Sequence, residues 1–200
     1  VEELSGEIIK SQIKAIFDDI EPAAVKIGMV SSPEIIVDIV NTMKKYNPSF
    51  LVVDPVMISK SGYSLLKSEA KENLIKYLIP MAYLVTPNVP EAEEITGIKI
   101  NSVTDMKVAG KKIFELGPKF VLVKGGHLDG EAVDVLMGEN IFEVFETKRI
   151  NRKNTHGTGC TISSAITAYL ALGYGIKEAV ELSKTYSTEA IYHSFDIGHG

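Results

Sequence analysis

The amino-acid sequence predicts an α/β protein in which helices cover both faces of a mostly parallel β-sheet. Short apolar runs rich in β-branched residues alternate along the chain with longer segments whose apolar residues recur at helical spacing, as in βαβ units. The expected strands are apolar at nearly every position, which is typical of strands buried on both faces. Two alternating runs late in the chain predict a hairpin and hence an antiparallel edge. No repeat or linker interrupts residues 1–200, which predicts a single domain.

Local signals place the individual elements. Pro22 stops the first helix, and Ser31-Ser32-Pro33-Glu34 starts the second with a serine cap and a proline just inside. Gly138-Glu139-Asn140 joins the two strands of the expected hairpin. In chain order we expect a helix over 4–20, a strand over 23–30, a helix from 33, a strand over 50–54, a helix over 68–78, a strand over 83–85, helices over 90–96 and 103–116, a strand over 120–123, hairpin strands over 132–137 and 141–145, and helices over 160–172 and 177–192.

Composition and charge exclude several classes of protein. With 200 residues, of which 45% are hydrophobic and 24% charged, the chain has the profile of an ordinary globular protein. The net charge of −5 shows no basic surplus, so nucleic acid is not an expected partner. No apolar stretch approaches the roughly 18 residues that cross a bilayer, so no membrane is expected either. The single cysteine, Cys160, cannot form an internal disulfide, which favours a cytoplasmic location.

Polar residues follow three of the expected strands at the point where each strand ends. Asp54 follows the first, Thr86-Pro87-Asn88 the second and Lys124-Gly125-Gly126-His127 the third. Ligands of open α/β sheets bind off the carboxyl ends of the strands. The recurrence therefore predicts a ligand site at this edge of the sheet.

The strongest single motif is Gly157-Thr158-Gly159-Cys160-Thr161, directly before a long apolar helix. Two glycines let the backbone approach a ligand closely, and the N–H groups and dipole of the helix start favour an anion. No Lys-Ser/Thr pair follows the glycines, so the motif is not a Walker A loop, and Ile162 occupies the third glycine position of a dinucleotide fingerprint. The motif predicts a phosphate site, and the alternative is a turn that only connects a strand to a helix.

Cys160 falls in the first turn of that helix, where the helix N-terminus is expected to lower the pKa of the thiol. It could act as a base, as a hydrogen-bonding group near the phosphoryl or as a nucleophile. The alternative is an inert buried cysteine. The nucleophile is disfavoured, because phosphoryl transfer between two bound substrates needs no covalent intermediate. His127 and His156 are expected to be structural, since no zinc spacing is present.

Three further side chains have two interpretations each. Asn88 and Glu91 have the spacing of a helix capping box, and they could equally orient Mg²⁺ through water. Lys124 could bind a phosphate group, or its side chain could simply extend so that the ammonium reaches the surface. Asp54 could anchor Mg²⁺ or accept bonds from loop N–H groups. The sequence leaves these alternatives open.

Taken in order, the segments resemble the hydroxymethylpyrimidine phosphate kinases of the ribokinase-like superfamily. The resemblance covers most of the chain, and it implies a three-layer α/β/α fold with an antiparallel edge hairpin. Each motif is only moderately specific, whereas the ordered set is highly specific. The matching segments are Lys26-Ile27-Gly28-Met29, Val53-Asp54-Pro55-Val56-Met57, Lys60-Ser61-Gly62, Thr86-Pro87-Asn88-Val89-Pro90-Glu91, Lys124-Gly125-Gly126-His127, Asn154-Thr155-His156-Gly157-Thr158-Gly159-Cys160-Thr161 and Gly198-His199-Gly200.

The resemblance implies an ATP- and Mg²⁺-dependent kinase of thiamine biosynthesis. Such kinases transfer the γ-phosphoryl group of ATP to 4-amino-5-hydroxymethyl-2-methylpyrimidine phosphate, and many also phosphorylate the free alcohol. A homodimer is also implied, since relatives are often dimers. The implied roles are an anion hole from Gly157, Thr158, Gly159 and Cys160, ATP binding by Lys124, Thr155 and Asn88, Mg²⁺ binding by Asp54 and Glu91, and pyrimidine contacts from Met29 and Val56.

Two departures from the family pattern stand out. Most relatives carry Asp where Cys160 stands, and a thiol suffices if the acceptor is a phosphate monoester, which is already largely ionised near pH 7 because its second pKa is about 6. We therefore hypothesise that Cys160 positions and polarises more than it abstracts a proton. The family also begins with a strand and a glycine-rich substrate loop, which we expect to precede the segments that residues 1–200 contain. An isolated chain of residues 1–200 is thus expected to bind nucleotide better than pyrimidine.

Three other functions compete with this one. The first is a pyridoxine or pyridoxal kinase of the same architecture, because several of these share the Gly-Thr-Gly-Cys loop. The second is a ribokinase-fold lyase that dehydrates hydrated nicotinamide cofactors. The third is a non-catalytic kinase-like module.

Overall fold

The computed structural model describes residues 3–58, 65–128, 130–152 and 155–195. Of the motifs above, Lys60-Ser61-Gly62, Asn154 and the terminal Gly198-His199-Gly200 lie outside these residues. In chain order the elements are α1 (Gly6–Phe17), β1 (Val25–Ile27), α2 (Pro33–Tyr46), β2 (Leu51–Val53), α3 (Ser68–Asn73) with a π-helical turn (Leu74–Leu78) and a 3-10 turn (Ile79–Met81), β3 (Leu84–Val85), α4 (Val89–Thr96), α5 (Val103–Phe114), β4 (Phe120–Lys124), β5 (Ala132–Gly138), β6 (Ile141–Thr147), α6 (Thr158–Ala171) and α7 (Ile176–Tyr192).

One sheet contains all six of these strands, in the order β1-β2-β3-β4-β5-β6. The first four run parallel to one another, and β5 and β6 form an antiparallel hairpin at the edge. The predicted mostly parallel sheet with an antiparallel edge hairpin is therefore confirmed. The strand predicted over 23–30 is shorter than expected and covers only Val25–Ile27.

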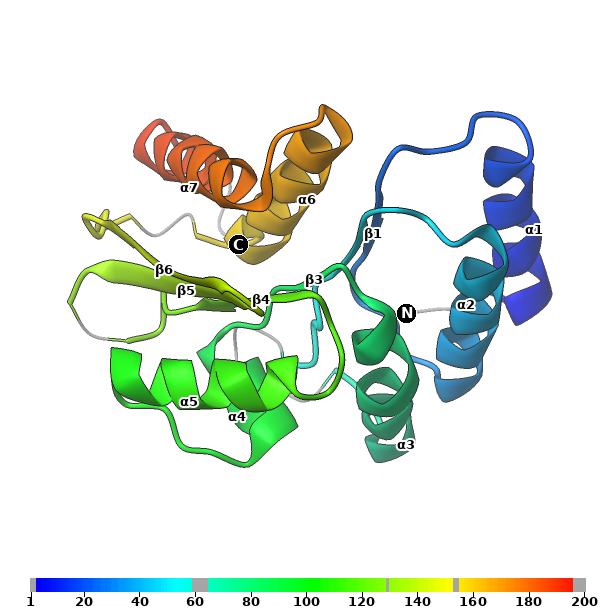
Figure 1. The fold of residues 1–200 in the computed structure, drawn as a ribbon, viewed down its shortest axis with the longest axis horizontal. Helices are drawn as coiled ribbons and strands as arrows, with labels where there is room; N and C mark the ends of the chain where they lie inside the picture. Colours follow the sequence, from blue (N-terminus) through cyan, green and yellow to red (C-terminus); the bar gives the residue numbers. More distant parts are fainter. Residues whose placement is uncertain (1–2, 59–64, 129, 153–154, 196–200) are drawn as a thin grey trace.

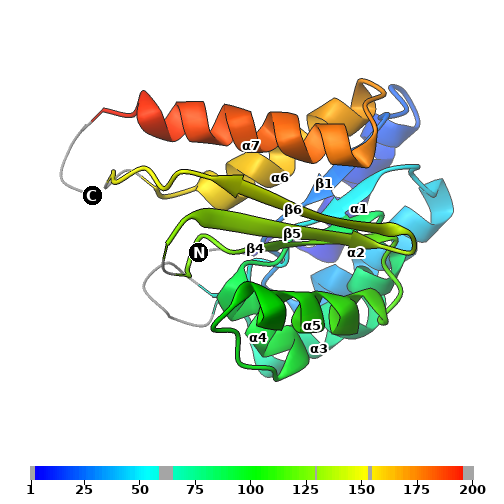
Figure 2. The same cartoon turned by 60° about the vertical axis from the view of Figure 1, so that its left-hand side comes forward.

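Helices cover both faces of the sheet (Figures 1 and 2). Alternate residues of each strand enter different cores: Val53 of β2 packs with α2 to α5, whereas Val52 packs with α6 and α7. Leu122 and Leu136 are fully buried under α6 and α7, together with Ile166 of α6. Burying one such side chain contributes about 1.5–3 kcal/mol, so the two cores hold the three layers together.

The helix starts that the sequence predicts are present. The Ser32 hydroxyl accepts a hydrogen bond from the N–H of Ile35 at 3.4 Å, and Pro33 occupies the first turn of α2. Asn88 and Glu91 form a complete capping box at the start of α4, which confirms the structural interpretation of that pair. Each cap satisfies N–H groups that have no partner within the helix itself. The caps therefore fix where these helices leave the sheet edge.

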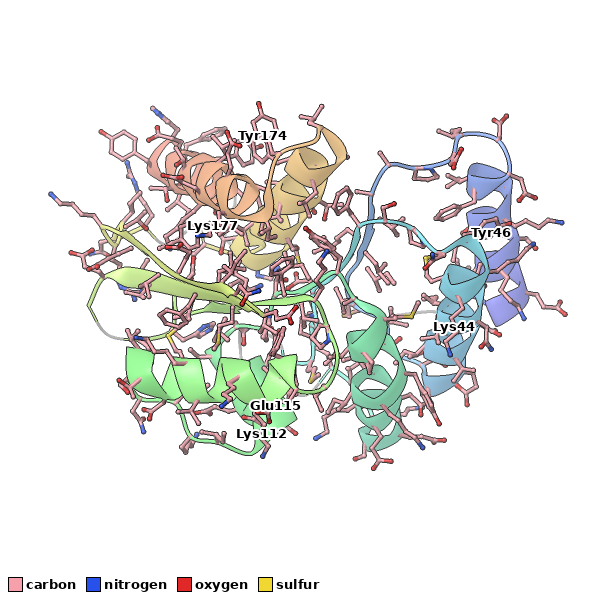
Figure 3. All side chains as sticks on the ribbon, in the orientation of Figure 1. Lys44, Tyr46, Lys112, Glu115, Tyr174 and Lys177 are labelled. Carbon is pink, nitrogen blue, oxygen red and sulfur yellow. The ribbon has the colours of Figure 1, made fainter. Side chains whose placement is uncertain are left out.

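The first helix is shorter and more exposed than predicted. α1 ends at Phe17, and none of its residues is fully buried. Ile16 and Ile20, two of the apolar residues at helical spacing in this segment, are 49% and 70% exposed. α1 packs on α2 instead: the rings of Phe17 and Tyr46 stack at 4.5 Å between centroids, and the Tyr46 hydroxyl donates to Asp18 at 2.7 Å (Figure 3). An apolar cavity of about 390 Å³ lies between α1, α2 and β1.

Two ion pairs fasten α7 to the hairpin. Lys177, at the start of the helix, pairs with Glu143 of β6 at the surface (Figure 3). Lys184, near the middle, reaches the buried Asp134 of β5 at 2.6 Å. None of the helices that the structure describes combines the length and apolarity needed to cross a bilayer.

Candidate active site

The carboxyl ends of β2 and β4 meet the start of α6 at one edge of the sheet. Asp54 directly follows β2, Lys124 ends β4, and Asn88 forms an isolated parallel bridge with Lys124. The Lys124 ammonium lies against the loop that opens α6, since a Cβ atom on Gly159 would be only 3.2 Å from Nζ. The predicted convergence of Asp54, Lys124 and the Gly-Thr-Gly-Cys loop is therefore present.

Asp54 is the best-connected side chain of this edge and is only 1% exposed. Its Oδ1 accepts from Lys124 Nζ at 2.9 Å and from Thr86 Oγ1 at 3.0 Å. Its Oδ2 accepts from Ser163 Oγ at 3.0 Å, so a residue of α6 completes the set. A buried carboxylate is tolerated only when it is paired and hydrogen-bonded, and all three partners meet that need. Asp54 thus ties three elements together at the site.

Ser163 was not predicted from the sequence. It stands three residues after Cys160 and therefore on the same side of α6, which is the signal that could have indicated it. Its hydroxyl also lies 3.0 Å from the Cys160 carbonyl oxygen. Arg149 was missed as well: it donates to the carbonyl oxygens of Gly126 at 2.8 Å and Gly130 at 2.7 Å, and so holds the loop after β4.

Glu91 is buried beside this cluster, at 3% exposure. Its carboxylate accepts from the N–H of Asn88 at 2.8 Å, and the Asn88 side chain accepts from the N–H of Glu91 at 2.9 Å. Burial raises the pKa of Glu91 to about 7, although the positive charge of Lys124 acts in the opposite direction. Near neutral pH this carboxyl group is therefore poised between its two protonation states.

Asp54 and Glu91, the two residues predicted to bind Mg²⁺, are both buried at this edge of the sheet. No group of three or more His, Cys, Asp or Glu side chains is placed to hold a metal within the ranges that the structure describes. Mg²⁺ needs no such cage, because it keeps several waters and is held by one or two carboxylates together with substrate phosphates. Asp54 and Glu91 are carboxylates, the type of ligand that Mg²⁺ prefers, but they are only 1% and 3% exposed, so their binding of the ion stays a prediction.

The loop that opens α6 has the geometry expected of an anion site. Gly157 has φ +78°, a left-handed conformation that favours glycine. The helix starts at Thr158, two residues earlier than predicted, and the Thr158 hydroxyl donates to the Thr155 carbonyl at 3.0 Å. Among the described residues no side chain caps this helix start, which leaves its N–H groups and the dipole to a ligand.

The expected low pKa of Cys160 is wrong. The thiol lies in the exposed first turn of α6, yet its pKa is raised. Partial desolvation is the largest cause, and the negative charge and hydrogen bonding of Asp54 add to it; Lys26 and Lys124 act in the opposite direction. Partial burial and a neighbouring carboxylate, both brought about by the fold, therefore raise the pKa that the sequence was expected to lower. The thiol stays protonated at neutral pH, which argues against Cys160 as a general base.

The remaining predicted residues lie around this centre. Met29 follows β1 and is 48% exposed, and Val56, after β2, is half-buried. His127, on the loop after β4, is exposed, and its pKa is lowered by partial burial and by the charges of Lys124 and Arg149. It is therefore neutral near pH 7.

The fold and the site define a phosphoryl-transfer enzyme of the ribokinase-like class. The chain belongs to the phosphomethylpyrimidine kinase family, since the family model "Phosphomethylpyrimidine kinase" matches residues 1–200. The hydroxymethylpyrimidine/phosphomethylpyrimidine kinase of Bacillus subtilis is 40% identical over 202 residues, which cover 100% of this chain and 74% of that protein. The family, the fold class and the phosphotransferase class predicted from the motifs are thus confirmed.

Other relatives extend the comparison. The thiamine biosynthesis bifunctional protein ThiED of Geobacter sulfurreducens is 45% identical over 193 residues; the match covers 96% of this chain and 39% of that protein. The crystal structure of phosphomethylpyrimidine kinase from Clostridium difficile 630 is 69% identical with a TM-score of 0.86, covering 95% of this chain and 78% of the other. The structure of an ADP complex of Bacillus subtilis pyridoxal kinase is 36% identical with a TM-score of 0.91. The match covers 98% of this chain and 74% of that chain.

Proposed function

We propose that this protein transfers the γ-phosphoryl group of ATP to hydroxymethylpyrimidine phosphate, which yields the diphosphate and ADP for thiamine biosynthesis. The observation that carries the proposal is the contact between the Lys124 ammonium and the uncapped start of α6, where a Cβ on Gly159 would lie 3.2 Å from Nζ. A cation and free N–H groups at one point suit the charge that develops on a phosphoryl group in transfer.

The proposed roles follow from this placement. The N–H groups of the Gly157–Cys160 turn surround the transferring phosphoryl group, and Lys124 contacts the nucleotide phosphates together with Thr155 and Asn88. Asp54 and Glu91 are the residues that would hold Mg²⁺, which supplies charge neutralisation between the nucleotide phosphates. Met29 and Val56 contact the pyrimidine ring, because each follows a neighbouring strand at the same sheet edge.

Cys160 serves in this proposal as a hydrogen-bond donor. Its raised pKa keeps the proton on sulfur. An acceptor that is a phosphate monoester is already largely ionised at neutral pH and needs no strong base. If Cys160→Ala kept full activity with the free alcohol as acceptor, a catalytic role of the thiol in that reaction would be lost.

A product assay tests the proposal directly. The protein, expressed from its complete gene, is incubated with ATP, Mg²⁺ and hydroxymethylpyrimidine phosphate, and the products are identified by mass spectrometry. We expect the pyrimidine diphosphate and an equal amount of ADP. Absence of the diphosphate would overturn the proposal, and ATP consumption without any phosphorylated organic product would favour the nicotinamide lyase.

Pyridoxal phosphorylation is a second candidate, because the pyridoxal kinase structures superimpose with a TM-score as high as 0.91. Parallel assays with pyridoxal and hydroxymethylpyrimidine compare kcat/KM for the two alcohols. A larger value for pyridoxal would reassign the preferred substrate. A single kinase domain over residues 1–200, a homodimer and a cytoplasmic location stay predictions.

A further inference from the structure

Lys26 of β1 is a cation that the site described so far does not use. Its neighbours Val25 and Ile27 pack into the core under α2 to α5. Side chains alternate along a strand, so Lys26 projects toward the opposite face. Its register partner Val52 belongs to that face and packs with Ile162 of α6. Lys26 therefore lies on the same side of the sheet as the start of α6.

The Lys26 ammonium folds back over Gly28 at the end of β1. A Cβ atom on Gly28 would lie only 2.7 Å from Nζ, so the glycine leaves the room that the ammonium occupies. β1, which carries Lys26, also packs directly against α6. These observations place Lys26 beside the loop proposed to hold the transferring phosphoryl group.

Lys26 has no acidic partner within the part of the chain that the structure describes. The ion pairs found there involve Lys10, Lys71, Lys99, Lys124, Lys177, Lys184 and His193. Lys124, across the sheet, is neutralised by Asp54 at 2.9 Å. Lys26 is half-buried, so its ammonium is partly shielded from water but still reachable by a ligand. A bound anion would supply the missing partner.

The two lysines lie on different sides of the transfer loop. β1 carries Lys26 and β4 carries Lys124, with β2 and β3 between them in the sheet. Met29, a proposed pyrimidine contact, follows β1. Lys26 therefore lies on the acceptor side and Lys124 on the nucleotide side.

The two acceptors differ in the charge of the group that attacks ATP. With the free alcohol, a neutral hydroxyl oxygen forms the bond to the γ-phosphorus, ADP leaves with the electron pair of the broken bond to the bridging oxygen, and the hydroxyl proton is released to water. With the phosphate monoester, a non-bridging oxygen of the acceptor phosphate forms the new O–P bond, the bond between the γ-phosphorus and the β–γ bridging oxygen breaks, and ADP leaves with that electron pair. In this second reaction two anionic groups must approach each other, which a nearby cation makes possible.

We propose that Lys26 binds the phosphate of the acceptor and is the residue that makes a phosphomonoester a good substrate. This inference rests on the proposed function. It assigns to Lys26 a specificity role, in which the residue discriminates a charged acceptor from a neutral one.

Steady-state kinetics of Lys26→Gln, with hydroxymethylpyrimidine phosphate and with hydroxymethylpyrimidine, test the proposal. We expect kcat/KM for the phosphate to fall about 10- to 100-fold, the effect of losing one charge-assisted hydrogen bond. For the alcohol we expect a change below about 3-fold, because no anion is lost there. Lys26→Arg retains most of the activity on the phosphate. The control Lys10→Gln, which alters an exposed pair with Asp38, changes neither.

The outcomes separate the inference from the function on which it rests. If the unmodified protein forms no diphosphate, the proposed function fails. If the unmodified protein forms it and Lys26→Gln loses activity equally on both acceptors, or on neither, the specificity role is overturned. Lys26→Met, which keeps the aliphatic stem packed, repeats the test if Lys26→Gln does not fold.

Discussion

Asp54 shows how one buried side chain organises a site. Its two oxygens take hydrogen bonds from Lys124 of β4, from Thr86 directly after β3 and from Ser163 of α6. Burial is the largest cause of the raised pKa of Glu91 and of Cys160, and the negative charge of Asp54 adds to it in both cases. One carboxylate therefore holds the ammonium in place and also keeps its neighbours protonated to higher pH.

Glu91 provides a test of this electrostatic picture in the pH dependence of stability. Burial raises the pKa of Glu91 from 4.5 to about 7, so the folded state binds its proton more tightly than the unfolded state. Its contribution to stability is therefore full below pH 4.5 and is lost as the pH rises to about 7. Glu91→Gln cannot ionise and removes this loss. Between pH 4.5 and pH 7 we expect the free energy of unfolding of the variant to rise by about 3 kcal/mol relative to that of the parent protein.

Urea unfolding of the Glu91→Gln variant and the parent across this pH range measures the difference. Glu94→Gln, a change at the exposed neighbour on the same helix, is the control. Stability curves of Glu91→Gln and the parent that run parallel from pH 4.5 to 7 would contradict the raised pKa.

Cys160 gives a second test at the scale of one residue, because it is the only cysteine of the chain. The thiol is exposed, so its rate of alkylation reports its ionisation rather than its access. With a raised pKa we expect iodoacetamide to react more slowly than with free cysteine at pH 7, and the rate to rise at higher pH. If the midpoint of the pH–rate curve lay below that of free cysteine, the pKa of Cys160 would be lowered, as the sequence predicted, and not raised.

At the scale of elements, one buried ion pair joins α7 to the loop after β4. Lys184 Nζ donates to Asp134 Oδ2 at 2.6 Å and to the carbonyl of Ala132 at 2.9 Å. The other oxygen of Asp134 accepts from the N–H of Gly125 at 3.0 Å, directly after Lys124. A distant helix thus supports the position of a nucleotide-side residue.

Removing only one partner of this ion pair should lower the free energy of unfolding far more than removing both partners. Asp134→Leu leaves the Lys184 charge buried without its partner, and we expect a loss of about 3–5 kcal/mol of unfolding free energy. The double variant Asp134→Leu/Lys184→Met should recover most of that loss. Lys177→Gln, at the exposed pair with Glu143, should cost less than about 1 kcal/mol. Chemical denaturation measures all three, and a double variant no more stable than Asp134→Leu would refute the argument.

The elements also show what the sequence could and could not predict. The caps at Ser32 and Asn88 depend on residues three positions apart, and their helix starts were predicted. Strand ends depend on neighbouring strands, so β1 came out shorter than expected. Ser163 reaches Asp54 across 109 positions of sequence, and no local pattern encodes such a contact. The pKa of Cys160 was predicted with the wrong sign for the same reason, because its partial burial and its neighbour Asp54 both arise only in the fold.

At the scale of the whole molecule, the site lies where both cores meet. Asp54 and Lys124 end strands that are packed on both faces, and the start of α6 comes from the layer above. A ligand bound there touches groups fixed by every layer. Occupancy of the nucleotide side should therefore stabilise the complete fold against unfolding, and not only its own loops.

ADP binding measures this linkage. A ligand that binds only the folded state stabilises it by about 2.7 kcal/mol at a concentration of 100 times Kd. We expect ADP with Mg²⁺ to raise the Tm accordingly, and ADP with EDTA to raise it less, because Asp54 and Glu91 would then repel the phosphates. In Lys124→Met the ADP-dependent shift should largely disappear, whereas Lys148→Gln, at an exposed lysine, should keep it. Comparing each variant with and without ADP cancels the effect of the substitution on the free protein. A full shift in Lys124→Met would place the nucleotide phosphates elsewhere.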